Sequence, residues 1–242
     1  MTPAPTYIRN FLLRSLPAAD IALLRPHLRT VELQRDEVLA EAGERIVRVY
    51  FPHSGVISLV VGLGEGEMVE AAMIGRDSVF GASAALGGGA SVSHAIVRLP
   101  GEASTLDAEY LRIAAERSAP LRTTLARHAQ ALFAQAQQSA ACNACHTVES
   151  RLSRCLSRLR DLSGGDSLPI TQESLSQMLG VRRNSVSIVA HALQQAGLIR
   201  YSRGAIEIAD SEGLRGSACE CYGAVKTYCD RLLGGQELRR TG

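Results

Sequence analysis

The chain has 242 residues, of which 46% are hydrophobic and 21% charged, and this length can bury one large core or two modest ones. No stretch reaches the roughly 18 unbroken apolar residues of a membrane-spanning helix, and the N-terminus lacks a signal-cleavage pattern, so we expect a cytoplasmic protein with no membrane partner. Six cysteines in a chain this long do not suggest a disulfide scaffold. The net charge is only +2, but the basic excess lies in the second half, a modest indication of a polyanionic partner.

In the first half of the chain, the hydrophobic pattern changes from one typical of helices to one typical of strands. Residues 7–28 predict short helices with a leucine-rich face. Residues 30–106 contain the short runs "TVELQ", "RVYFP", "GVISLVVGL", "EMVEAAMIG" and "HAIVRLP", separated by glycine-containing turns. Many short strands with regular turns predict a β-sandwich or barrel.

A long helix is predicted next, with Pro120 in its first turn. The segment "LRTTLARHAQALFAQAQQSA" carries an apolar stripe that needs a partner helix, and we expect dimer contacts from Leu121, Leu125 and Leu132. A second amphipathic helix, "VESRLSRCLSRLRDL", ends at "SGGDSLP", the best linker in the sequence.

The segment after this linker has the pattern of a winged helix-turn-helix. Thr171 can cap a first helix, Gly180 can make the turn, and a second helix follows over residues 182–196. Gly197 ends that helix, and "LIRYSRGAIEIA" predicts two short strands that form a wing.

The second helix carries the candidate DNA contacts on the face opposite its apolar residues. We expect Arg183 and Asn184 to read bases and Ile188 to contact thymine methyl groups, unless Ile188 is instead buried against the wing or the N-terminal domain. A winged helix used only for protein contacts is the alternative for the whole unit. The remaining candidates serve mostly the phosphates or the helix cap: Thr171, Gln172, Arg182, Ser185, Ser187, His191, Arg200 and Arg203.

Several motifs resemble the Crp/Fnr superfamily of transcription regulators: "VYFPHSGVISLV", "MIGRDSVFG", "TQESLSQMLGVRRNSVS", "QQAGLIRY" and "ACECY". The texture is most similar to a branch without an assigned effector. The resemblance implies an α+β fold with an N-terminal β-roll (a jelly-roll) over 1–118, a dimerisation helix over 119–141 and a winged helix-turn-helix over 142–242. It further implies a homodimer on a palindromic DNA operator, with RNA polymerase as a further partner.

The cyclic AMP anchors of that family are missing here. Ala82 stands at its glutamate position and Ser93 or His94 near its arginine position, so tight cyclic AMP binding is not expected, and no cofactor is needed for the fold. The roll either holds some other anion or binds nothing. The candidate effector residues are Gly81, Ala82, Ser83, Ser93, His94 and Gln137. The second helix of the helix-turn-helix also differs from the family pattern, because Asn184 and Ile188 stand in place of a glutamate and an arginine. The family's usual operator sequence is therefore not assumed.

The cysteines leave alternatives open. "CNACH" (Cys142, Cys145, His146) has the spacing of c-type haem attachment, and Cys142 with Cys145 could sense oxidants if a helix start lowered a thiol pKa. Simple packing of small residues is the favoured interpretation. Adding the cysteines of "ACECYGAVKTYC" does not give a usual metal-ligand spacing, so no metal site is predicted. A redox- or haem-responsive protein is therefore the alternative function. An enzyme is not expected, because no catalytic triad, carboxylate pair or phosphate loop stands out.

Overall fold

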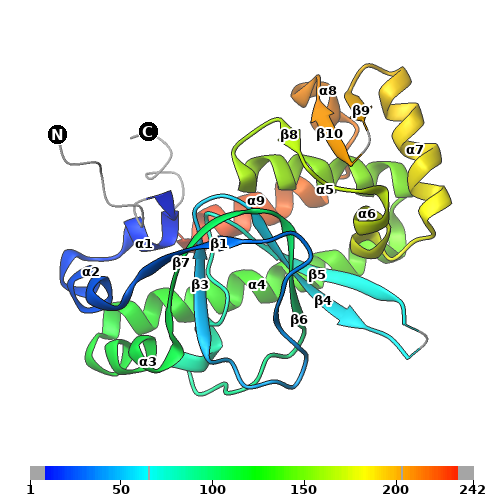
Figure 1. Ribbon diagram of the computed structural model, residues 1–242. Helices are drawn as coiled ribbons and strands as arrows, with labels where there is room; N and C mark the ends of the chain where they lie inside the picture. The colour runs from blue at the N-terminus through cyan, green and yellow to red at the C-terminus, as the bar shows by residue number, and fades with distance from the viewer. Residues whose placement is uncertain (1–8, 65, 203, 234–242) are drawn as a thin grey trace.

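The computed structural model describes residues 9–64, 66–202 and 204–233, and Figure 1 shows its two parts. The N-terminal part is a β-roll of two antiparallel sheets, in the strand orders β1-β7-β3 and β2-β6-β4-β5. Its strands are β1 (Arg29–Leu33), β2 (Val38–Ala40), β3 (Arg48–Pro52), β4 (Val56–Gly62), β5 (Met68–Ile74), β6 (His94–Leu99) and β7 (Gly101–Asp107).

Short helices close one end of this roll. They are α1 (Phe11–Ser15), α2 (Ala18–Leu24), η2 (Arg25–His27), η3 (Ala82–Ala85) and α3 (Ala108–Arg117). Asn10 caps α1 and also donates to the carbonyls of Pro52 and Ser78, both at 2.9 Å, so the N-terminal helix is tied to the roll. Apolar side chains of both sheets meet inside the roll, among them Leu33 of β1, Ile57 of β4 and Val97 of β6. The predicted β-roll is confirmed.

The long helix α4 (Ala119–Cys145) begins at the Ser118 cap, with Pro120 in its first turn, and runs along the roll (Figure 1). Its end was expected at residue 141, but helical hydrogen bonding continues to Cys145 because no glycine or proline interrupts the chain before the extended His146 cap.

Two of the three predicted dimer contacts on α4 are contradicted by their burial, whereas Leu132 is half-buried and stays a prediction. Leu121 and Leu125 are fully buried in the core that α4 shares with the N-terminal helices, and Leu132 packs against the interior of the roll. The apolar stripe was correctly located, but its partner is the chain's own roll. A stripe in a sequence does not specify which surface covers it.

The C-terminal part is the predicted winged helix-turn-helix. After α5 (Val148–Ser163) come β8 (Ser167–Leu168), α6 (Gln172–Leu179), α7 (Arg183–Gln195), β9 (Ile199–Ser202), β10 (Ala205–Ile208), α8 (Ser211–Gly216) and α9 (Cys221–Leu233). The three strands form one small sheet, in the order β8-β10-β9. The helix α9 packs back along α4.

The two parts share a hydrophobic core. Val56, Met73 and Leu99 of the roll lie in the same buried cluster as the leucines of α5 and the apolar face of α7. A Cβ atom added to Gly75 would lie 2.6 Å from the Leu162 side chain, so the roll approaches α5 closely. The orientation of the winged helix is therefore tied to the roll by packing.

Candidate functional site

The turn between α6 and α7 is fixed by two local features. The Thr171 hydroxyl accepts a hydrogen bond from the Ser174 amide at 3.0 Å and caps α6. Gly180 ends α6 with a φ of +60°, and a Cβ atom there would lie 2.7 Å from Val69 of β5. Glycine is needed at this position for both the conformation and the close approach.

The second helix, α7, presents a polar face to solvent at the outer edge of the molecule (Figure 1). Its opposite face, with Val186, Ala190 and Leu193, is buried in the shared core. Five candidate DNA contacts are exposed: Arg182, Arg183, Asn184, Ile188 and His191. Ile188 is 71% exposed, so it is not buried against the wing.

Other candidates are already engaged in the protein. Ser187 is half-buried and donates to the Gln172 side-chain oxygen at 2.6 Å, which links α7 to the start of α6. Ser185 is also half-buried. On the wing, Arg200 is exposed and forms an ion pair with Glu207 at 3.5 Å, whereas Arg203 lies outside the described residues.

The hairpin of β4 and β5 lies beside the arginine couplet. A groove between the hairpin and the helix-turn-helix is lined by Glu67 and Met68 from one side and by Arg182 and Arg183 from the other.

The candidate effector residues have mostly internal partners. Gly81, with a φ of +88°, packs against the β3 backbone, Ala82 is buried, and Ser83 is exposed. The Ser93 carbonyl accepts a hydrogen bond from Ser91, and His94 pairs with the Glu41 carboxylate. That carboxylate opposes the binding of an anion by His94. Gln137 is exposed on α4.

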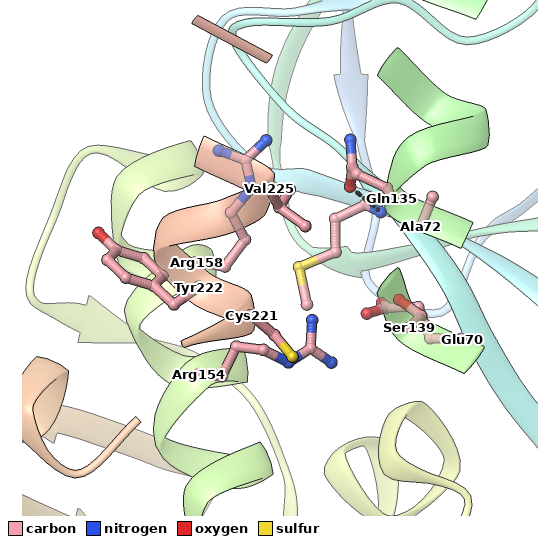
Figure 2. Close-up of a pocket in the computed structure, with 10 residues that line it drawn as sticks. Glu70, Ala72, Gln135, Ser139, Arg154, Arg158, Cys221, Tyr222 and Val225 are labelled. Atoms are coloured by element: carbon pink, nitrogen blue, oxygen red, sulfur yellow. Dashed lines mark hydrogen bonds between the residues drawn. The ribbon is translucent and has the colours of Figure 1, made fainter. Parts of the chain in front are cut away.

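A pocket between the two parts was not predicted from the sequence. Figure 2 shows Glu70 of β5 and the α5 arginines Arg154 and Arg158 around it, with Cys221 and Tyr222 of α9. Glu70 accepts a short hydrogen bond from Ser58, and burial raises its pKa to about 7, although the nearby arginines act in the opposite direction. The two arginines, four residues apart on an amphipathic helix, were the only sequence signal for this polar interface.

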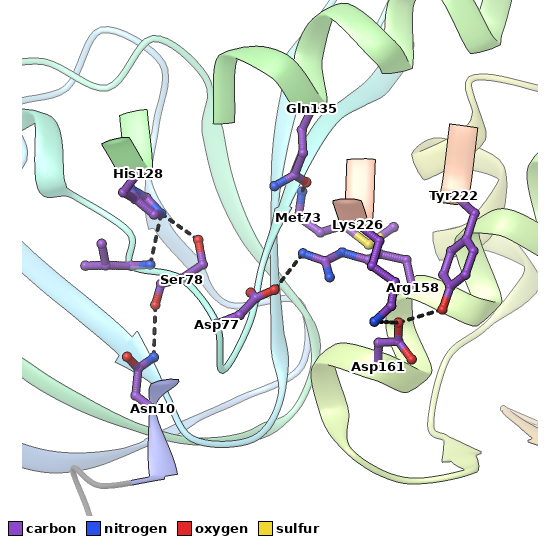
Figure 3. A network of polar contacts seen from close by, with 11 residues as sticks. Asn10, Met73, Asp77, Ser78, His128, Gln135, Arg158, Asp161, Tyr222 and Lys226 are labelled. Carbon is purple, nitrogen blue, oxygen red and sulfur yellow. Dashed lines mark hydrogen bonds and ion pairs between the residues drawn. The ribbon is translucent and has the colours of Figure 1, made fainter. Parts of the chain in front are cut away.

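A polar network continues from this pocket across the molecule (Figure 3). Arg158 forms a largely buried ion pair with Asp77 at 2.9 Å, and Tyr222 of α9 donates to Asp161 of α5 at 2.7 Å. His128 of α4 accepts from the Val79 amide at 3.2 Å, and burial lowers its pKa to about 4. The network joins the roll, α4, α5 and α9 through polar contacts.

The structure contradicts a reactive Cys142–Cys145 pair. Cys142 is fully buried and its Sγ lies 3.5 Å from that of Cys219, whereas Cys145 is exposed one turn further on. Burial raises the pKa of Cys142, which is the reverse of the thiolate activation expected at a helix start. Covalent haem attachment through "CNACH" also requires an accessible Cys142 sulfur, which this burial denies.

Two family models match the sequence, a cyclic nucleotide-binding domain over residues 30–118 and a Crp-like helix-turn-helix domain over residues 150–216. The chain belongs to the Crp/Fnr superfamily. It is accordingly a transcription regulator with a DNA-binding domain rather than an enzyme. No curated protein is similar to it in sequence. Among the residues that the structure describes, no helix is both long and apolar enough to span a bilayer.

Solved structures of Crp/Fnr regulators share the fold. A Crp/Fnr-family regulator from Eubacterium rectale has 20% identity and a TM-score of 0.64, and the match covers 85% of this chain and 98% of the regulator's chain. FixK2 from Bradyrhizobium japonicum has 17% identity and a TM-score of 0.66, covering 79% and 98%. The c-di-GMP-responsive regulator CLP from Xanthomonas campestris has 16% identity and a TM-score of 0.62, covering 79% and 99%.

Proposed function

We propose that this Crp/Fnr regulator acts in the cytoplasm as a homodimer that binds a palindromic operator through α7. The exposed polar face of α7 is the observation that carries the proposal, because its N-terminal residues are those that reach base edges when such a helix enters the major groove. RNA polymerase is proposed as a further partner.

Base contacts are assigned to three exposed residues in the first half of α7, whose side chains form no hydrogen bond or ion pair with the described part of the chain. Arg183 can bind guanine through two hydrogen bonds, Asn184 can bind adenine, and Ile188 can contact thymine methyl groups. Arg182, His191 and the wing arginines Arg200 and Arg203 are assigned mainly to phosphates. Thr171, Gln172, Ser185 and Ser187 support the helices, since three of these side chains take part in contacts between or within α6 and α7.

Dimerisation is assigned to the exposed face of α4 in place of its buried leucines. A regular alternation of four and three residues relates eight positions, and all eight are exposed: Ala119, Thr123, Ala126, Gln130, Phe133, Gln137, Ala140 and Ala144. This spacing is that of a coiled-coil seam, and its small residues permit close approach of a second helix. Phe133, 65% exposed in the single chain, would be buried at the centre of the seam.

Selection of bound duplexes from a random pool tests the proposal. We expect enrichment of a two-fold symmetric site whose half-sites are about one helical turn apart, with affinity that falls steeply as salt rises. Recovery of no sequence preference, together with a protein that binds other proteins through α7, would instead support the protein-contact alternative.

Cyclic AMP is not proposed as the effector. Ala82 has no carboxylate that could bind a ribose. The His94 side chain pairs with the Glu41 carboxylate, so it does not offer a phosphate the positive charge that binding would need. Calorimetric titration with cyclic AMP should therefore show no tight binding, and a sub-micromolar dissociation constant would contradict this assignment.

A further inference from the structure

Four metal-ligand side chains meet where the end of α4 contacts the start of α9. Cys142 lies in the last turn of α4 and His146 is its C-cap, whereas Cys221 is the first residue of α9 and Cys219 lies two residues before it. Their three sulfurs and a ring nitrogen all lie within 4.8 Å of one another. The three cysteines are buried, whereas His146 is half-buried and leaves one side of the cluster open to solvent.

Two of the ligand pairs already have the separation of ligand atoms around a single tetrahedral ion. The Cys142 and Cys219 sulfurs are 3.5 Å apart, and the Cys221 sulfur is 3.5 Å from Nδ1 of His146. Zinc holds thiolate sulfur at about 2.3 Å and imidazole nitrogen at about 2.0 Å, which separates tetrahedral ligand atoms by about 3.5–3.8 Å. Three sulfurs and one nitrogen are also the ligand types that zinc takes in closed structural sites.

The surrounding side chains are arranged as supporting groups of a metal site. The far nitrogen of His146, Nε2, lies 3.1 Å from the Glu220 carboxylate, a contact that places the proton on Nε2 and leaves Nδ1 free as a ligand. Gln138 donates to the Cys221 sulfur at 3.0 Å. Three thiolates and one Zn²⁺ carry a net charge of about −1. Arg154 lies beside Cys221 in the interdomain pocket, and its positive charge offsets the negative charge of the site (Figure 2).

We propose that Cys142, His146, Cys219 and Cys221 bind one zinc ion that fastens α9 to the end of α4. Three thiol protons leave as the ion binds, and the imidazole coordinates in its neutral form. The ion joins the helix that carries the proposed dimer seam to the last helix of the DNA-binding part. The sequence spacing missed this site because the histidine, and not Cys145, supplies the fourth ligand.

Metal analysis of the purified full-length chain, made without a histidine tag, tests the proposal. We expect about one zinc per chain, and a loss of at least about tenfold in the Cys221→Ser variant. Cys145→Ser is the matched control, because it removes the exposed cysteine of the same motif and should retain the zinc. Absence of zinc together with failure to take up added Zn²⁺ under reducing conditions would overturn the proposal, as would equal metal loss in the two variants.

A spectroscopic measurement keeps the test independent of any folding defect in the variants. The unaltered protein loaded with Co²⁺ should show the visible bands of a tetrahedral ion and thiolate charge-transfer absorption. Iron with acid-labile sulfide, or a Cys142–Cys219 disulfide in non-reducing peptide mapping, would contradict the zinc assignment. Glu220→Ala should weaken Zn²⁺ affinity about 10–100-fold, as expected for a positioning residue. None of these outcomes depends on DNA binding.

Discussion

Glu70 is a buried acid that costs stability at neutral pH. It lies on β5, its carboxylate accepts a hydrogen bond from Ser58, and burial raises its pKa from 4.5 to about 7. Between these two values the unfolded chain releases this proton while the folded chain retains it. The free energy of unfolding therefore falls as pH rises from 4.5 to about 7, and the full cost persists above that pH.

The Glu70→Gln variant removes this ionisation and keeps an acceptor for the Ser58 hydroxyl. At 1.36 kcal/mol per pH unit, the raised pKa corresponds to about 3 kcal/mol. We expect the variant to be more stable than the unaltered protein by about that amount near pH 8, with the advantage shrinking to nothing near pH 4.5.

Urea unfolding of both proteins at several pH values measures the difference directly. All other titrating groups are common to the two chains and cancel in the comparison. Glu32→Gln, at an exposed carboxylate on β1, serves as the control, and its stability difference should vary with pH much less than that of Glu70→Gln because solvent screens exposed charges. A stability difference for Glu70→Gln that does not change between about pH 5 and pH 8 would refute the reasoning.

Three further predictions concern other parts of the molecule. Phe133→Glu should weaken the dimer at least about tenfold in sedimentation equilibrium, because a charge replaces the central apolar residue of the seam; Val92→Glu, an exposed apolar residue in a loop of the roll, should leave it unchanged. Gly180→Ala should lower the free energy of unfolding by about 1 kcal/mol more than Gly197→Ala does. Both glycines have a positive φ, but only a Cβ atom at position 180 would meet the Val69 side chain. In a Val69→Ala background the two substitutions should therefore cost the same. In the Glu70→Gln background, His128 should lower stability by about 3 kcal/mol as pH drops from 6.5 to about 4, since the unfolded chain protonates this side chain first. This fall is the stability difference between Glu70→Gln and Glu70→Gln/His128→Gln, in which the other titrating groups cancel, and a difference that does not change with pH would contradict the assignment.

The exposed polar face of α7 was predictable from the sequence, whereas contacts between distant segments were not. Val186, Ala190 and Leu193 recur at helical spacing, so the opposite face of α7 could be assigned without coordinates. The burial of Leu121 could not, because a stripe of leucines is equally compatible with a second chain and with the roll. The burial of Glu70 between the two parts also required the packing of β5 against α5 and α9.

The cysteine cluster illustrates the same limit. Cys219 follows Cys142 by 77 residues, and only the return of α9 along α4 brings the two together. Helix periodicity alone does not resolve the "CNACH" motif, because residues three and four apart both lie near the same face. In the structure the chain leaves the helix at His146, which joins the cluster with Cys142, whereas Cys145 is exposed.

The measurement that bears most directly on DNA recognition by α7 is the affinity of arginine variants for the selected operator. Arg183→Ala should lose about 1–3 kcal/mol of binding and relax the base preference at one position, whereas Arg182→Ala should weaken all sequences alike and reduce the salt dependence. Arg35→Ala, an exposed arginine on the roll, is the control and should bind normally. Unchanged operator affinity after both α7 arginines are replaced would contradict the account.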